Sequence, residues 1–415
     1  MCRIITVGSI RRTPVRKENE RRSNVRAKVS IVRAGAKDFD EHVFAGVRKS
    51  IDLVGGVESF AKRGDSVLVK PNIVAAAVGA VTDRRVTFAV AKLFADHGCK
   101  VLVGDDPHAS VRDTGSLYDF YGLEEVAARA GAEVVDLRSG PKKKISLDGG
   151  RVLTDVEVSQ VALEADAIVS VPVLKSHPLT TITLGMKNMK GVLPRKSKML
   201  FHEMGVAFGV AELCKVLPLK LTVIDGIIGQ DMWAGQMKPT GVILAGGDPV
   251  ATDAVGASVM GYDPKGVDHL SYAVTLGLGT NDLDAIEVAG DVSLEDARTQ
   301  SFTMAPDPRE LCEKAGISLV EGAPCSGCLA MISDALDKMK PGLREKFRGW
   351  TMVVGPKAKA PDSDRVLVVG RCLGKYREKL PIIDYCPPES WRIIGKFQEL
   401  AAGMRSQAPK ASAEG

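Results

Sequence analysis

The fold class is decided by the stretch Asp65-Ser66-Val67-Leu68-Val69-Lys70-Pro71-Asn72, together with residues 82–97 and the run Lys100-Val101-Leu102-Val103-Gly104 that follow it. Short valine-rich runs that stop at Pro or Gly are typical of strands, and the amphipathic run between them, closed by Gly98, predicts a helix. A strand, a helix and a second strand in this order predict a β-α-β unit of a parallel sheet.

The same alternation continues on both sides of this unit. Apolar runs without polar alternation suit strands that are buried on both faces of a parallel sheet. We expect further strands at residues 29–32, 133–136, 167–173 and 221–224, and further helices at residues 43–54 and 123–130. Past a proline-rich boundary at residues 304–308 we expect strands at 317–320, 351–354, 366–369 and 380–384, and helices at 329–339 and 391–400.

The sequence therefore predicts an α/β protein of two domains. Residues 28–303 form a large domain with a wound, mostly parallel sheet, and residues 309–400 form a smaller C-terminal α/β domain that carries four cysteines. Nine basic and two acidic side chains fall in residues 1–28, so the rest of the chain is nearly neutral despite a net charge of +5. We expect residues 1–27 to be a disordered basic extension and residues 401–415 a disordered tail.

The composition narrows the class of protein. The chain has 415 residues, of which 45% are hydrophobic and only 5% aromatic, so stacking platforms for single-stranded nucleic acid are not expected. No apolar run approaches the roughly 20 residues of a membrane span, and the basic N-terminus is not followed by the apolar core of a secretory signal. We expect a cytoplasmic protein. Eight cysteines in a reducing compartment point to metal binding or catalysis instead of disulfides.

Four of the cysteines form a candidate metal site: Cys325, Cys328, Cys372 and Cys386. Each of their three loci follows the end of an expected strand, at the edge where parallel sheets bind ligands. Four thiolates can hold an iron–sulfur cluster, here most simply a 4Fe–4S cluster, or a zinc ion. The uneven spacing favours the cluster over a compact zinc site. A thiol–disulfide pair at the first two positions and unrelated buried cysteines are the remaining alternatives.

A second candidate site lies in the large domain, where residues 174–191 follow an apolar strand. This segment concentrates cations, amides and hydroxyls that suit a small anionic ligand such as a carboxylate or a phosphate. The alternative is a surface loop with solvated lysines. The candidates are His177 and Lys187 as catalytic groups, and Lys175, Thr180, Thr181, Asn188 and Lys190 as substrate-binding groups. His177 is the expected general acid–base, with lysines as electrostatic stabilisers.

Polar residues also follow several other expected strands. If these strands are parallel, their ends meet in one crevice, and the residues join the same substrate site. Taken singly, such residues are also ordinary turn and cap residues. Neither a Gly-x-Gly-x-x-Gly motif nor a P-loop occurs. The additional substrate-binding candidates are Lys70, Asn72, Asp105, Asp225, Asp248 and Asp253.

Three of these segments resemble the domain-of-unknown-function 362 family, which is widespread in anaerobic bacteria and archaea. They are residues 65–72, the Leu174-Lys175-Ser176-His177 to Lys190-Gly191 stretch, and residues 248–253. The resemblance implies an association with iron–sulfur clusters, although this chain lacks the ferredoxin-type insert of many members. The C-terminal domain is similar to small cluster-bearing domains of oxidoreductases that have a late Gly-Cys-Pro-Pro turn, with Tyr385 in place of the glycine.

The leading hypothesis is an iron–sulfur redox protein, possessing a crevice for a small anionic substrate and exchanging electrons with that substrate or with a redox partner protein. A non-redox enzyme acting on a carboxylate or phosphate, with structural zinc in its C-terminal domain, is the second hypothesis. An accessory protein that carries a cluster or metal to a partner is the third.

Overall fold

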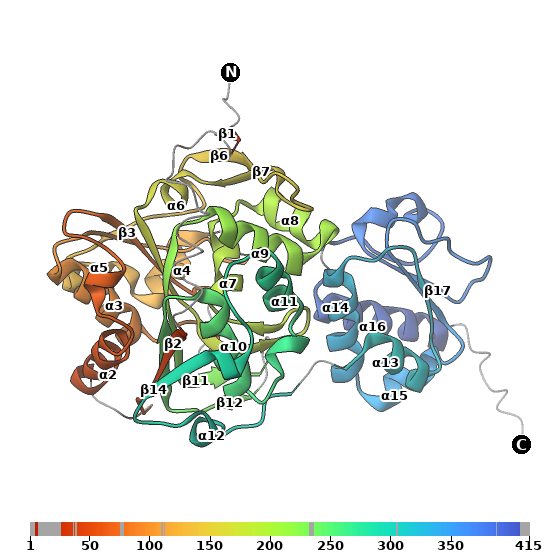
Figure 1. Cartoon of the computed structure of the whole chain (residues 1–415). Helices are drawn as coiled ribbons and strands as arrows, with labels where there is room; N and C mark the ends of the chain where they lie inside the picture. The colour runs from red at the N-terminus through yellow and green to blue at the C-terminus, as the bar shows by residue number, and fades with distance from the viewer. Residues whose placement is uncertain are drawn as a thin grey trace, which may run out of the picture. The chain divides into compact units, whose positions relative to one another are not determined.

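The computed structural model of the chain is shown in Figure 1. It describes residues 5–6, 26–35, 37, 40–74, 79–108, 111, 113–231, 236–303, 306–386 and 388–406. The chain divides into two compact units, residues 1–303 and residues 304–415. Both units are α/β, with helices packed against a largely parallel sheet, as the strand and helix patterns predict.

The first unit is built on an 11-stranded sheet with the main strand order β14-β2-β13-β11-β8-β3-β4-β5. Its central strands β11, β8, β3, β4 and β5 run parallel, whereas β13 is antiparallel to both of its neighbours, β11 and β2. The strands are β2 (Ala27–Arg33), β3 (Ser66–Pro71), β4 (Lys100–Val103), β5 (Glu133–Val134), β8 (Ala167–Val171), β9 (Val173–His177), β10 (Thr181–Thr183), β11 (Leu219–Gln230), β12 (Met237–Lys238), β13 (Val242–Gly246) and β14 (Ile286–Gly290).

Helices cover both faces of this sheet, because successive residues of each strand point to opposite faces. Val67 and Val69 of β3 pack with helices α2, α3 and α5, whereas Leu68 packs with the cluster that includes α7, α9 and α10 (Figure 1). Such a strand is apolar throughout, which explains the unbroken apolar runs of the sequence. The α-helices of this unit are α2 (Asp40–Asp52), α3 (Arg84–Asp96), α4 (Thr114–Tyr121), α5 (Leu123–Ala130), α6 (Gln160–Glu164), α7 (Gly185–Asn188), α8 (Arg195–Met204), α9 (Val206–Val216), α10 (Pro249–Val259), α11 (Asp268–Thr275) and α12 (Leu294–Ala297).

Short 3-10 helices complete the first unit. They are η2 (Val57–Ser59), η3 (Met189–Val192), η4 (Pro264–Gly266) and η5 (Leu283–Ala285). Of these, η3 follows α7 directly and carries Lys190. No helix in the described ranges is long and apolar enough to cross a membrane.

A separate three-stranded sheet in the first unit was not predicted. It has the order β1-β6-β7 and consists of β1 (Ile5–Thr6), β6 (Lys142–Ser146) and β7 (Thr154–Ser159). Strand β1 pairs in parallel with β6, so the expected disorder of residues 1–27 is wrong at Ile5–Thr6 and at Ala27, which begins β2. Residues 1–4 and 7–25 lie outside the described residues.

The second unit is a small parallel sheet covered by helices. Its strands β15 (Ser318–Glu321), β16 (Thr351–Val354), β17 (Val366–Val369) and β18 (Ile382–Ile383) pair in that order, all in parallel. The helices are α13 (Pro308–Ala315), α14 (Ser326–Lys338), α15 (Pro341–Arg344), η6 (Glu345–Phe347), η7 (Arg371–Tyr376) and α16 (Ser390–Ser406). Because α16 continues to Ser406, the expected disordered tail does not begin at residue 401; residues 407–415 lie outside the described residues.

Candidate functional site

The polar residues that follow β3 and β4 meet in one buried ion pair. Lys70 Nζ lies 2.6 Å from Asp105 Oδ1 and donates a hydrogen bond to Asn188 Oδ1 at 2.9 Å. Both charged side chains are buried, with 0% and 2% of their surface exposed. Burial lowers the pKa of Lys70, and the neighbouring Asp105 offsets part of that effect. The positive charge of Lys70 is thus compensated within the protein.

Gly191, at the end of the polar motif, lies directly against this ion pair. A Cβ atom on Gly191 would overlap Asp105 Oδ1 and Lys70 Nζ, so a residue with a side chain cannot occupy this position without moving them. The carbonyl of Gly191 accepts a hydrogen bond from Asp106 N at 2.8 Å. The glycine therefore lets η3 lie directly against the polar edge of the sheet.

Asn72 and Lys175 extend the same network. Lys175 Nζ donates to Asn72 Oδ1 at 2.9 Å and to Ala80 O at 3.0 Å, and Asn72 Nδ2 donates to Asn188 Oδ1 at 3.4 Å. Burial lowers the pKa of Lys175 to about 8. The structure brings together five of the predicted substrate residues, but their polar groups largely satisfy one another. These five residues form a hydrogen-bonded framework that supports the neighbouring residues of the motif.

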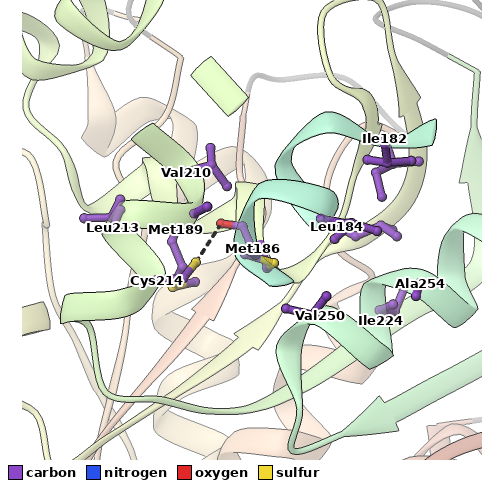
Figure 2. Close-up of a cluster of buried hydrophobic side chains, with 14 of the residues drawn as sticks. Ile182, Leu184, Met186, Met189, Val210, Leu213, Cys214, Ile224, Val250 and Ala254 are labelled. Carbon is purple, nitrogen blue, oxygen red and sulfur yellow. Dashed lines mark hydrogen bonds between the residues drawn. The ribbon is translucent and has the colours of Figure 1, made fainter. Parts of the chain in front are cut away.

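Helix α7, which carries Lys187 and Asn188, is held in place by helix α10. Asp253 of α10 accepts hydrogen bonds from Gly185 N at 2.8 Å and Met186 N at 2.9 Å, which are the free amides of the first turn. Burial raises the pKa of Asp253 to about 7. Figure 2 shows Met186 and Met189 among apolar side chains of neighbouring elements, including Leu213 and Val250. These contacts fix one side of the segment, so its lysines lie outside this apolar cluster.

Lys187 and Lys190 have no carboxylate ion-pair partner within the described residues; Lys175 has none either, but the nearby Asp105 offsets part of the effect of burial on its pKa. Lys187 Nζ donates a weak hydrogen bond to Thr183 Oγ1 at 3.4 Å, and Lys190 Nζ lies 3.1 Å from His202 Nε2. Both side chains lie deep in the protein yet are partly accessible to solvent. Burial and the neighbouring lysines hold the pKa of Lys187 well below its usual value, and burial with Lys198 lowers the pKa of Lys190 to about 7. An anion bound here would supply the missing counter-charge.

His177, at the end of β9, has a defined tautomer. Its Nδ1 accepts a hydrogen bond from Leu179 N at 3.0 Å, so the neutral ring carries its proton on Nε2. The side chain is 7% exposed. Burial, followed by the nearby charges of Lys187 and Lys190, holds the pKa of His177 well below its usual value. The ring can therefore donate from Nε2 to a bound anion. Because Nε2 already carries the proton of the neutral ring, it cannot act as a base.

Two further histidines and a lysine of this region were missed by sequence reasoning. His202 lies on α8 beside Lys190, and its Nδ1 is buried without a partner in the described part of the chain. Burial and the lysines, led by Lys190, lower the pKa of His108 to about 4. Lys198, also on α8, pairs with Asp106 at 3.1 Å and so keeps a counter-charge. The four-residue spacing of Lys198 and His202, which places them on one helix face, was the available signal.

In this basic site Lys198 is paired with Asp106, whereas Lys187 and Lys190 have no carboxylate ion-pair partner among the described residues. The two lysines can carry positive charge, and neutral imidazoles can supply hydrogen-bond donors. Such a combination could bind small anions, such as carboxylates or phosphates. An amine whose pKa is near neutrality, such as Lys190, can also accept a proton from a substrate. Lys190 therefore suits the role of a base better than His177 does.

The remaining predicted residues have other contacts. Thr180 is buried and donates to Ile182 O at 3.0 Å, and Thr181 adopts a positive φ of 61° in the turn between β9 and β10. Asp225 of β11 accepts hydrogen bonds from Asp83 N at 2.7 Å and Ile227 N at 3.0 Å. Burial, with Asp83 beside it, raises the pKa of Asp225 to about 7. Asp225 lines a pocket of about 220 Å³ with Thr82, Asp83, Arg84, Phe120 and Tyr121.

Asp248 does not belong to the same edge of the sheet. Strand β13, which precedes it, is antiparallel to β11, so its carboxyl end lies at the opposite edge from the ends of β3, β4 and β8. Asp248 caps helix α10 there by accepting from Val250 N and Ala251 N, both at 2.9 Å. The prediction of one crevice for all the strand-end residues is therefore wrong for Asp248.

In the second unit the four predicted cysteines lie at the carboxyl ends of the strands. Cys325 caps α14 after β15, and Cys328 lies in its first turn. Cys372 lies in η7 after β17, and Cys386 follows β18. A hydrogen bond with Cys325, burial, and the nearby thiols of Cys386 and Cys372 all raise the pKa of Cys328. The structure thus brings the four sulfurs near one another.

Gly370 lies close to two of these sulfurs. A Cβ atom on Gly370 would lie 3.3 Å from Cys328 Sγ and 3.5 Å from Cys372 Sγ. Among the described residues, no group of three or more His, Cys, Asp or Glu side chains is arranged so that it could hold a metal ion. Four thiolates can hold either a zinc ion or an iron–sulfur cluster.

Comparisons with known proteins support the resemblance seen in the sequence. Residues 67–258 match the family described as a domain of unknown function, DUF362, which confirms the resemblance over those residues. The chain is 29% identical over 269 residues to the thylakoid-associated protein sll1697 of Synechocystis sp. (strain ATCC 27184 / PCC 6803 / Kazusa), covering 60% of this chain and 79% of that protein.

Two solved structures are similar at low identity. The lactate racemase apoprotein from Thermoanaerobacterium thermosaccharolyticum is 12% identical, with a TM-score of 0.38 and a match that covers 57% of each chain. A protein from Thermotoga maritima is 11% identical, with a TM-score of 0.38, and the match covers 77% of this chain and 71% of that one.

Proposed function

We propose that this chain is an iron–sulfur protein that acts on a small anionic substrate. Residues 304–415 hold the cluster, and residues 1–303 bind the substrate. The observation that carries the proposal is the basic site at Lys187 and Lys190, whose ammonium groups have no carboxylate partner in the described residues. Such charges are costly inside a protein unless a ligand neutralises them.

The substrate is a carboxylate or a phosphate small enough to reach both lysines. Lys187 and Lys190 form ion pairs with it, and His177 donates a hydrogen bond from Nε2. Lys190 is the group that takes up a proton during turnover, because its pKa of about 7 lets it gain and lose protons near neutral pH. The framework of Lys70, Asp105 and Asn188 keeps these groups in position.

The cluster ligands are Cys325, Cys328, Cys372 and Cys386. Cys325 and Cys328 begin helix α14, whose N-terminal amides and dipole favour thiolates. A bound iron–sulfur cluster supplies one-electron transfer, and a redox partner protein would deliver or remove those electrons. Zinc in the same place would make the unit structural and the enzyme non-redox.

The two halves of the proposal are tested on one preparation. Protein purified without oxygen should be brown, contain iron and acid-labile sulfide in equal amounts, and bleach on reduction. A colourless protein with one equivalent of zinc would exclude the redox half. For the substrate half, Lys187→Met should abolish binding of phosphate or acetate in calorimetry, whereas Lys196→Met, an exposed lysine on α8, should not. Equal binding by both variants would exclude the anion site.

A further inference from the structure

His202, on helix α8, is in direct contact with the amine of Lys190. Its Nε2 lies 3.1 Å from Lys190 Nζ, whereas its Nδ1 is buried and has no hydrogen-bond partner in the described part of the chain. His177 differs, because its Nδ1 accepts from Leu179 N and this bond fixes the tautomer. The bond made by one ring nitrogen decides which nitrogen carries the proton. For His202 that bond is the contact with Lys190.

The position of His202 is fixed by another residue of the same helix. Lys198 lies 3.1 Å from Asp106 Oδ1 and donates to the carbonyl oxygens of Asp106 and Pro107, both at 2.7 Å. These contacts tie α8 to the residues that follow β4. Residues four apart lie on one face of a helix, so the anchor at Lys198 also holds His202 beside Lys190.

The contact requires a different tautomer of His202 for each charge state of Lys190. An ammonium group has donors and no lone pair, so Nε2 must then accept and the ring proton lies on Nδ1. A neutral amine has a lone pair that accepts from an Nε2–H group, and this tautomer avoids a buried Nδ1–H group without a partner. Burial and Lys198 lower the pKa of Lys190 to about 7, so both charge states occur near neutral pH.

We propose that His202 is the positioning residue of Lys190, donating from Nε2 to its neutral amine and accepting at Nε2 from its ammonium group. This inference rests on the proposed role of Lys190 as the base of the anion site and adds the group that holds it in both states. When the pair takes up a proton, N–H bonds form at Nζ and at Nδ1, and the Nε2–H bond breaks. One of these protons comes from Nε2 and the other from water, so the ring stays neutral.

The charged groups around this pair keep the imidazole neutral. Burial, followed by the charges of Lys190 and Lys187, holds the pKa of His202 well below its usual value. The carboxylate of Asp106 is shared by Lys198 and Arg138, which lie 3.1 Å and 2.7 Å from its Oδ1. The titratable groups packed around the pair are Lys187 of α7, Lys198 of α8, His177 of β9, His108 and Asp106 after β4, and the Lys70–Asp105 ion pair beside Gly191.

The tautomer can be read from the ring nitrogens of His202 by NMR, in ligand-free full-chain protein that is isotope-labelled at histidine. Its resonances are those that disappear in His202→Gln. As the pH rises through about 7, we expect Nε2 to change from an unprotonated to a protonated nitrogen, and Nδ1 to change in the opposite direction. A single tautomer on both sides of this pH would overturn the proposal.

Two lysine variants show which group drives the exchange of tautomers. Lys190→Met should abolish it, because the amine is gone. Lys196→Met, which removes an exposed lysine of the same helix, should leave it unchanged. This comparison matters because burial lowers the pKa of Lys198 to about 8, close to that of Lys190. An exchange that persists in Lys190→Met would assign it to another group and overturn the proposal.

Sulfate calorimetry at about pH 7 separates this role from the anion site. His202→Phe removes both ring nitrogens, whereas the amide of His202→Gln offers a donor and an acceptor. We expect the dissociation constant to rise about tenfold in the phenylalanine variant and about threefold or less in the glutamine variant, because the ammonium loses its acceptor only in the first. If the phenylalanine variant binds like wild type and Lys190→Met does not bind, the anion site stands and the role of His202 is lost. If wild type binds no sulfate but the tautomers still exchange, the role of His202 stands and the anion site fails.

Discussion

The backbone N–H of Leu179 donates to His177 Nδ1 at 3.0 Å, and this bond decides what the histidine can do. The neutral ring must carry its proton on Nε2, so it offers a donor to the basic site. The sequence predicts His177 as a general acid–base; in the structure its Nδ1 accepts a hydrogen bond within its own turn, so the neutral ring carries its proton on Nε2.

Two substitutions separate these roles. His177→Gln keeps an N–H group near the position of Nε2, whereas His177→Asn keeps an acceptor for Leu179 N but is too short to place its amide donor where Nε2 stands. We expect the sulfate dissociation constant to rise about tenfold in the asparagine variant and about threefold or less in the glutamine variant. The opposite order, measured by calorimetry, would show that the acceptor nitrogen is the functional one.

The Lys70–Asp105 pair should contribute strongly to stability. Asp105→Asn leaves the ammonium of Lys70 buried without its counter-charge, and we expect a loss of about 3–5 kcal/mol in the free energy of unfolding. Denaturant unfolding followed by circular dichroism measures this loss.

The matched control is another lysine–aspartate pair, at the surface. Lys144 lies 2.8 Å from Asp155, and both side chains are well exposed. Asp155→Asn should change the free energy of unfolding by less than about 1 kcal/mol, because water screens this pair. Similar small losses in both variants would mean that Lys70 finds another partner or loses its proton at little cost.

The cluster assignment predicts a selective effect on iron content. Cys386→Ala should remove most of the iron and sulfide, because a four-thiolate site loses one ligand. Cys312→Ala should keep both, since Cys312 is buried on α13 and lies apart from the four sulfurs in sequence. Sulfate affinity in the first unit should be unchanged in either variant. Full iron content in Cys386→Ala would show that this cysteine is not a ligand.

The fold was largely predictable because its main signals are local. The apolar runs at β3, β4, β8 and β17 are each followed by Pro, Gly or polar residues, and their lack of alternation follows from burial on both faces. The direction of β13 was not predictable, because an antiparallel strand in the middle of a sheet has the same apolar run as a parallel one. That single reversal moves Asp248 to the other edge.

The candidate site was only partly predictable for a related reason. Lys187, Lys190 and His177 stand in one continuous motif, so their spacing reveals them. His202 comes from α8, and no local pattern in the sequence predicts that it lies beside Lys190. The sequence also does not show which lysines have carboxylate partners: Lys70 does, whereas Lys190 does not in the described residues.

Binding at this site should be linked to proton uptake. The pKa of Lys190 is about 7 in the ligand-free protein, and a bound anion stabilises the ammonium and raises that pKa. At pH values above 7 the free protein lacks this proton and the complex holds it. Affinity for an anion should therefore fall as the pH rises, and each binding event should take a proton from the buffer.

Sulfate calorimetry at about pH 8, in two buffers that differ in ionisation enthalpy, tests the central claim most directly. Sulfate is a dianion at this pH and does not take up protons itself, so any proton taken up from the buffer enters the protein. We predict that the wild-type protein takes up protons when it binds sulfate, with Lys190 as one acceptor, and that Lys190→Met takes up markedly fewer. No sulfate binding, or binding without proton uptake and with an affinity independent of pH, would contradict the account of an anion site built on uncompensated lysines.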